Sequence, residues 1–374
     1  WYSVFASRLL RLSRSRSPLS TAMEPAVEQP QRVQNLAEAG LRHLPSDYIQ
    51  PPESRPAAHP GHSLDSGDGL PVVDLFCFDP GRRDDVRGEI QRACKEWGAF
   101  QVVNHGVTHQ LLDDMIAAGR RFFRCPKEEK QRYSCDPRSA ASEGYGSRML
   151  SKGDGVLDWR DYFDHHTLPL SRRDPRRWPD LGNYREVLVA YSNSMMMLAQ
   201  KLLYLISESL GLPPLYIEAM IGEVYQNITV SYYPACPQPE LALGLQSHSD
   251  MGAITLLIQD DVGGLEVFKD GLWVPLIPLS NAIIVILADQ TEIISNGEYR
   301  SAVHRAIVNP GRPRLSVATF YDPSKDTKIS PAPELVTECS PVQYHEVLYG
   351  DYVSSWYGKG PGGKRNIDAL LIHR

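Results

Sequence analysis

A series of short apolar runs in the last third of the chain constrains the fold more than any other feature. These runs alternate with residue pairs such as Asp270-Gly271 and Asn296-Gly297, which are typical of tight turns between strands. Many short strands joined in this way favour a double-sheet jelly roll. The predicted strands are residues 254–259, 265–268, 272–276, 282–287, 303–308 and 315–321.

Helical periodicity dominates the part of the chain that precedes these strands. Val86, Ile90 and Ala93 fall on one face of a predicted helix over 84–97. The predicted fold class is therefore mixed α and β, with helices flanking a jelly-roll core. Further helices are predicted at 33–43, 110–123, 184–210 and 340–356, and a loop with short strands is predicted at 143–167.

We expect four regions along the 374 residues of the chain. Residues 1–69 are a disordered leader followed by an N-terminal arm. Residues 70–224 are an N-terminal region of helices and strands, and residues 225–325 are the jelly-roll core. Residues 326–374 are a C-terminal helix and tail. The N-terminal region is expected to pack on the jelly roll as one unit.

Three side chains in the strand-rich part have the character of metal ligands. Residues i and i+2 of an extended strand point the same way, so His248 and Asp250 can present a nitrogen and an oxygen to one point. His304 follows Asp250 by 54 residues, which is far enough to return on another strand. Two histidines and one carboxylate suit non-haem Fe(II) oxygen chemistry. Zinc accepts the same donors with water in a fourth position.

The residues that follow favour iron over zinc. Arg314 and Ser316 repeat the i, i+2 spacing within a predicted strand. A guanidinium binds a carboxylate through two parallel hydrogen bonds, and a hydroxyl adds another donor. Tyr233 offers a further donor from a strand just upstream. A hydrolytic zinc site has no need of this group, which would hold a dicarboxylic acid beside the metal.

These segments together resemble the plant Fe(II)/2-oxoglutarate-dependent dioxygenases, an isopenicillin N synthase-like family. The similarity is to members of the leucoanthocyanidin dioxygenase and flavonol synthase type. It implies a distorted double-stranded β-helix with iron bound by His248, Asp250 and His304. It also implies that Tyr233, Arg314 and Ser316 bind 2-oxoglutarate. The matching segments are 70–75, 97–107, 232–240, 241–250, 292–297, 299–301 and 304–305.

The resemblance implies that a small plant specialised metabolite or hormone is hydroxylated, desaturated or dealkylated. Succinate and CO2 would be released, O2 consumed, and ascorbate used as the reductant. No catalytic side chain is expected beyond the metal centre. Two alternatives stay open: a catalytically silent binding protein on the same fold, and an iron oxidase that uses ascorbate without 2-oxoglutarate.

By position in the family, Tyr162, Asp164, Thr229 and Phe320 are expected to face the substrate. Thr229 stands where flavonoid-oxidising members resemble one another in having lysine, and Asp164 replaces a bulky aromatic residue. These differences argue against anthocyanidin or flavonol synthase activity. For Phe320, plain core packing is an equal alternative, because aromatic residues dominate cores as well as sites.

The remaining histidines have simpler interpretations. His105 follows a strand-like run and precedes a glycine, so we expect it to belong to a structural turn rather than to a metal site. His165 and His166 have two alternatives, either lining the mouth of the substrate site or being exposed on the surface.

Composition excludes several classes of partner. The formal net charge of −6 gives no electrostatic reason to bind nucleic acid or an anionic membrane. No apolar run reaches the roughly 18 residues that suggest a membrane span. Six cysteines without a Cys-x-x-Cys pair fit reduced thiols. We therefore expect a cytoplasmic monomer that acts on a small molecule.

The first 22 residues contain four arginines, six serines and no acidic residue. This is the composition of an organellar transit peptide. Since Met23 resembles an ordinary start, translated upstream sequence is the favoured interpretation and a transit peptide is the alternative. In both cases the leader is expected to be disordered.

Overall fold

An eight-stranded sheet forms the centre of the fold, in the order β1-β2-β10-β7-β12-β5-β4-β3. β1 pairs with β2 in parallel, whereas the other neighbours pair antiparallel. Its strands are β1 (Val72–Asp74), β2 (Ala99–Val103), β3 (Gly144–Gly146), β4 (Asp161–Leu168), β5 (Val224–Tyr233), β7 (Ile254–Gln259), β10 (Ile283–Leu287) and β12 (Arg314–Pro323). This computed structural model describes residues 32–56, 69–76, 83–135, 143–146, 155–359 and 365–372.

A smaller sheet has the order β6-β11-β8-β9. Leu265 and Val267 of this sheet share a core with Leu257 and Ile284 of the large sheet, so the two sheets pack face to face. This double-sheet arrangement agrees with the predicted jelly roll. The small sheet consists of β6 (Leu245–His248), β8 (Leu265–Lys269), β9 (Leu272–Pro275) and β11 (His304–Ala306), and a separate pair consists of β13 (Lys328–Ile329) and β14 (Val347–Leu348).

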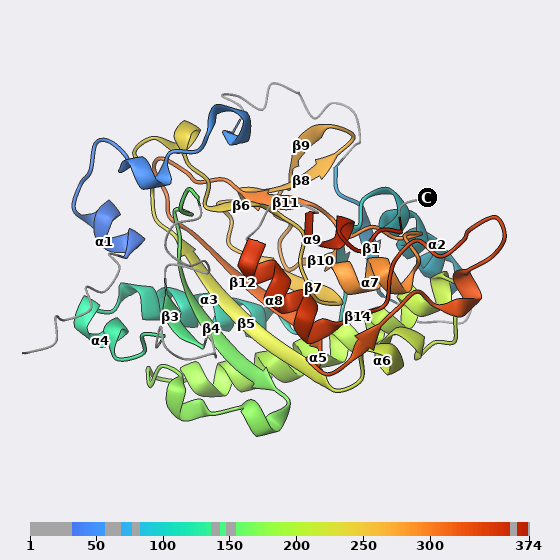
Figure 1. Ribbon diagram of the computed structural model, residues 1–374. Helices are drawn as coiled ribbons and strands as arrows, with labels where there is room; N and C mark the ends of the chain where they lie inside the picture. The colour runs from blue at the N-terminus through green and yellow to red at the C-terminus, as the bar shows by residue number, and fades with distance from the viewer. Residues whose placement is uncertain are drawn as a thin grey trace, which may run out of the picture. The chain divides into compact units, whose positions relative to one another are not determined.

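Helices cover the opposite face of the large sheet, where α3 and α5 run along it (Figure 1). Gly119 of α3 lies so close to the sheet that a Cβ would come within 2.8 Å of the Val230 side chain. The helices are α1 (Val33–Glu38), α2 (Arg83–Glu96), α3 (His109–Arg124), α4 (Lys127–Gln131), α5 (Tyr184–Ser209), α6 (Tyr216–Ile221), α7 (Asp289–Ile294), α8 (Tyr349–Lys359) and α9 (Arg365–Asp368). Short 3₁₀ segments lie at Ser46–Tyr48, Pro52–Ser54, Leu170–Arg172, Pro175–Arg177, Pro239–Leu241 and Pro333–Leu335.

Along β4, β5 and β12, strand alternation gives the large sheet a mainly apolar face toward the helices and a mainly polar face on the other side. Ile228 and Val230 of β5 belong to the core that contains the helices. Thr229, Ser231 and Tyr233 alternate with them and therefore point toward the small sheet. This polar part of the sheet, called its polar face below, thus lies inside the jelly roll, beside the apolar contact of Leu257 and Ile284 with the small sheet.

Three local predictions need correction. The C-terminal helix predicted at 340–356 begins only at Tyr349, because Val347 pairs with Ile329 in a small sheet. The helix predicted at 33–43 ends at Glu38, and Gly40 follows in a left-handed conformation with φ of 70°. Asn296-Gly297 has the positive φ values of a tight turn, but it follows α7 rather than a strand.

Other predictions agree with the structure or lie outside it. Asp270-Gly271 joins β8 to β9 with positive φ at both residues, as its turn chemistry predicts. The disordered leader predicted at residues 1–22 lies outside the described residues. Among the described helices, none is both long and apolar enough to cross a bilayer.

Candidate metal and cosubstrate site

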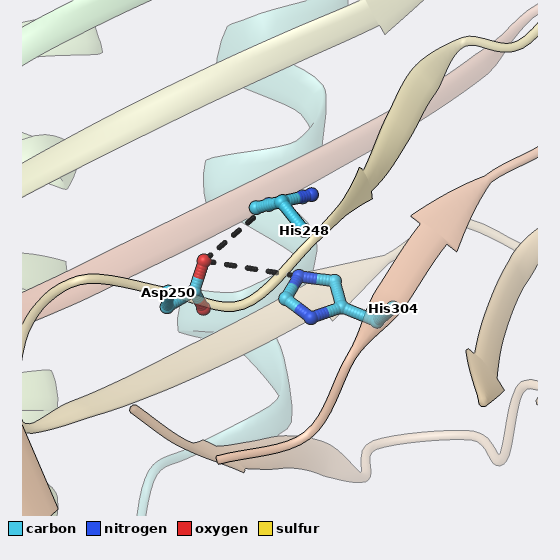
Figure 2. A group of neighbouring side chains, drawn as sticks. All are labelled: His248, Asp250 and His304. Atoms are coloured by element: carbon cyan, nitrogen blue, oxygen red, sulfur yellow. Dashed lines mark ion pairs between the residues drawn. The ribbon is translucent and has the colours of Figure 1, made fainter. Parts of the chain in front are cut away.

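Three buried side chains converge between the two sheets. His248 ends β6, Asp250 follows two residues later, and His304 begins β11 directly opposite His248 in the strand register. Figure 2 shows both histidines beside the same carboxylate oxygen of Asp250. The Nε2 atoms of His248 and His304 lie 3.5 Å and 3.8 Å from Oδ1 of Asp250. One potential ligand atom from each residue lies within 4.8 Å of the others.

Hydrogen bonds orient each of these donors. Nδ1 of His248 lies 2.8 Å from the carbonyl of Gln246, and Nδ1 of His304 lies 3.0 Å from that of Ala302. In both rings the opposite nitrogen, Nε2, is therefore directed at Asp250. The Thr255 hydroxyl donates to Oδ2 of Asp250 at 2.6 Å, which leaves Oδ1 for the shared point.

The protonation of His304 and Asp250 suits a metal. Burial, reinforced by the nearby His248, lowers the pKa of His304 to about 4. Burial alone would raise the pKa of Asp250, but His304 and His248 outweigh it and bring the pKa to about 2. A neutral imidazole and an ionised carboxylate are the forms that bind metal ions. The donor set therefore fits Fe(II) at neutral pH.

The residues predicted to bind the cosubstrate also lie together. Arg314 opens β12 opposite Tyr233 of β5, and its guanidinium carbon lies 4.7 Å from the centre of the Tyr233 ring. Its Nη1 lies 3.4 Å from the hydroxyl of Ser316, to which it donates. Its Nη2 donates to the amide oxygen of Gln259 at 2.8 Å. The sequence had drawn no attention to Gln259.

Arg314 is only 2% exposed, yet in the described part of the chain it forms no ion pair with a carboxylate. Its Nε has no hydrogen-bond partner among the described protein atoms. A buried charge without a counter-ion is costly, and a bound anion would relieve that cost. The arginine therefore fits a carboxylate ligand.

Arg160 is a second arginine at this end of the site, and it was not among the residues predicted from the sequence. It directly precedes β4, where continuation of the register places it opposite Tyr233. Its Nη1 donates to the Ser231 hydroxyl at 3.3 Å. Burial alone would raise the pKa of Tyr233, but Arg314 and Arg160 together bring it below its ordinary value. The available signal was its i, i+2 spacing from Tyr162.

The four residues expected to face the substrate share the polar face of the large sheet. Tyr162 lies opposite Ser231, and Asp164 lies opposite Thr229. Phe320 lies opposite Thr255, whose hydroxyl binds Asp250. The register thus directs Phe320 toward the metal cluster rather than toward the helices, and its side chain is half-buried.

The other histidines lie apart from the cluster. His105 lies in a turn where Asn104 and Gly106 have positive φ, and it is hydrogen-bonded to the carbonyl of Asn281. His165 and His166 are both buried, so surface exposure is the wrong alternative for them. His165 stacks on Phe163, which belongs to the core between the large sheet and the helices. His166 lies on the polar face.

Replacement of Thr255 with valine is expected to weaken Fe(II) binding about tenfold, because the Asp250 carboxylate loses the donor that fixes its rotation. Serine at the same position should restore most of the affinity. Anaerobic competition against a coloured Fe(II) chelator measures the effect. Thr319→Val, on the opposite face of β12, is the matched control. Unchanged affinity in Thr255→Val would show that this hydroxyl does not position the ligand.

Two protein-family models match successive parts of the chain. Residues 225–323 match the 2OG-Fe(II) oxygenase superfamily. Residues 70–181 match the family described as non-haem dioxygenase in morphine synthesis N-terminal. Jasmonate-induced oxygenase 4 of Arabidopsis thaliana is 41% identical, over 91% of this chain and 97% of that protein. Leucoanthocyanidin dioxygenase of Petunia hybrida is 35% identical, over 88% of this chain and 79% of that protein.

A solved structure is similar over nearly its whole length. The crystal structure of JOX2 in complex with 2OG, Fe and JA superimposes with a TM-score of 0.84 and 39% sequence identity. The match covers 92% of this chain and 99% of that one.

Proposed function

The chain belongs to the 2OG-Fe(II) oxygenase superfamily, and from that premise we propose that it oxidises a small plant metabolite or hormone at the His248, Asp250 and His304 cluster. The proposal rests on one observation above all. The jelly roll contains both a buried cluster of three potential metal ligands and a buried arginine, Arg314, that has no carboxylate partner in the described residues.

The donor set supports specific roles in binding. His248, Asp250 and His304 would hold Fe(II) on one face and leave neighbouring positions for the cosubstrate and O2. When bound, the iron supplies the coupling of O2 reduction to substrate oxidation and to conversion of 2-oxoglutarate into succinate and CO2. Arg314, Ser316 and Tyr233 would bind the carboxylate of 2-oxoglutarate that lies away from the metal.

The residues around these ligands keep the reactants in place. The Arg314 guanidinium is held by Gln259 and stacked near Tyr233, so it is ordered before the cosubstrate arrives. Thr255 fixes the rotation of the Asp250 carboxylate. All three donors are buried, which would limit the access of water to the reacting region. On the same face, Tyr162, Asp164, Thr229 and Phe320 would contact the substrate.

We also propose that O2 serves as oxidant and ascorbate as reductant. The protein works as a cytoplasmic monomer on a small molecule. Free cysteines at 94, 125, 135, 236 and 339 support a reducing compartment. The division into regions 1–69, 70–224, 225–325 and 326–374 also stays a proposal. JA, present in the JOX2 structure, makes plant hormones one class of candidate substrate.

Substrate oxidation coupled to succinate release tests this function. The protein is incubated with Fe(II), 2-oxoglutarate, ascorbate, air and a plant metabolite extract, and mass spectrometry follows both changes. We expect a compound to gain one oxygen, or to lose two hydrogens or an alkyl group, in proportion to succinate. Oxidation without succinate would indicate the ascorbate-dependent iron oxidase. Metabolite binding without any product would indicate the silent binding protein.

A further inference from the structure

The polar face of the large sheet has a cationic end. Arg160, Tyr233 and Arg314 lie in one row across three neighbouring strand positions. Both arginines act electrostatically on Tyr233. A dianionic cosubstrate is complementary to this end, because its carboxylate remote from the metal is attracted to the guanidinium groups.

The same face becomes acidic further along the strands. Asp164 is 6% exposed and accepts a short hydrogen bond from the Thr229 hydroxyl. Asp322 lies further along, on β12, where it is opposite Tyr225 of β5. An ionised carboxylate offers about four acceptor positions. In the described part of the chain, Thr229 is the hydrogen-bond donor to the Asp164 side chain, so acceptor positions remain on a buried charge.

Asp164 is the better candidate of the two acids for binding a ligand. The Asp322 carboxylate is packed against Gly252 and hydrogen-bonds with Tyr349, and Arg172 lies near it. The charged groups that act on Asp164 are Arg160, at the cosubstrate end, and Glu143. Glu143 pairs with Arg177 and accepts from Trp178. Burial raises the pKa of Asp164 to about 6, which leaves the carboxylate ionised at neutral pH.

We propose that Asp164 anchors a protonated amine of the substrate, so that this enzyme oxidises an amine-bearing aromatic or alicyclic molecule rather than a carboxylic acid. The inference rests on the proposed function, since it places the substrate on the face that carries the metal cluster. A buried carboxylate is stabilised by a cation that replaces its lost water. Tyr162 and Phe320 on the same face provide apolar surface for the body of the molecule.

The strand order separates Asp164 from the metal cluster. β4, which carries Asp164, is separated from β7, which carries Thr255 beside the metal cluster, by β5 and β12. Three strand spacings of roughly 4.8 Å give a separation on the order of 14 Å along the sheet. The amine is therefore remote from the oxidised carbon and serves for recognition.

Binding of matched probes tests the anchor without turnover. The anaerobic protein, loaded with Fe(II) and 2-oxoglutarate, is titrated calorimetrically with tryptamine, tryptophol and indole-3-acetate. Tyramine, tyrosol and 4-hydroxyphenylacetate form a second set. We expect each amine to bind about tenfold or more tightly than its alcohol, with the acid weakest. Absence of amine binding, or tighter binding of the acids, would overturn the proposal.

Asp164→Asn removes the charge at nearly constant size. The amine and the alcohol of each set should then bind about equally, whereas 2-oxoglutarate affinity and the thermal unfolding midpoint should stay unchanged. Asp261→Asn, at an exposed carboxylate paired with Arg312, is the matched control. Amine preference that survives in Asp164→Asn would also overturn the anchor.

The two proposals fail in different ways. Succinate release without amine preference would leave the proposed function standing and remove the anchor. Amine preference without succinate release would leave the anchor standing and remove the proposed function.

Discussion

Replacement of Asp250 with alanine is expected to remove bound iron and to abolish succinate formation. Oδ1 of Asp250 is the anionic donor shared by the two histidines, at 3.5 Å and 3.8 Å from their Nε2 atoms. Without it, only the two imidazoles remain as ligands. Removing even an outer contact of a metal ligand costs about 10- to 100-fold in metal affinity or activity. We therefore expect loss of a ligand itself to lower turnover by at least about a hundredfold.

Iron content by mass spectrometry and succinate formation measure this effect together. Asp261→Ala, at an exposed aspartate on the surface, controls for loss of a carboxylate elsewhere. His248→Ala and His304→Ala should behave like Asp250→Ala. An Asp250→Ala protein that keeps both stoichiometric iron and normal turnover would refute the proposed ligand set.

Replacement of Arg314 with alanine is expected to raise the KM for 2-oxoglutarate about 30-fold or more, because truncating one partner of a buried charge pair costs about 2–5 kcal/mol. The guanidinium is buried, held by Gln259 and without a carboxylate partner in the described residues. Iron binding should stay unchanged. Lysine at this position should restore part of the affinity, since it keeps the charge but not the bidentate geometry.

Steady-state kinetics with 2-oxoglutarate as the varied substrate give this result. Arg312→Ala removes an exposed arginine two residues away, which pairs with Asp261, and should leave the KM unchanged. A normal KM in Arg314→Ala would rule out the proposed role of Arg314 in binding 2-oxoglutarate, whereas the metal ligands are tested by the Asp250, His248 and His304 variants.

Local spacing made the core of the site predictable. His248 with Asp250, and Arg314 with Ser316, each needed only the two-residue period of a strand. The position of His304 could be expected only in outline, because it depends on the pairing of β6 with β11, which joins residues far apart in sequence. Family resemblance supplied that connection.

Contacts between distant segments set the limits of prediction. The Asp164–Thr229 hydrogen bond follows from the pairing of β4 with β5, which no local pattern reveals. Arg160 has the local i, i+2 spacing from Tyr162, but its place beside Tyr233 also depends on this strand pairing. The C-terminal helix was predicted to begin too early, because the pairing of Val347 with Ile329 overrides local helical preference. Turn chemistry at Asn296-Gly297 predicted the backbone conformation but not the helix that precedes it.

An iron anomalous-difference map from crystals grown anaerobically with Fe(II) and 2-oxoglutarate tests the central claim most directly. The expected result is one strong peak bonded to Nε2 of His248, Nε2 of His304 and Oδ1 of Asp250. The carboxylate of 2-oxoglutarate that is remote from the metal should lie against Arg314. Iron located away from these three atoms, or 2-oxoglutarate bound without contact to Arg314, would contradict the account.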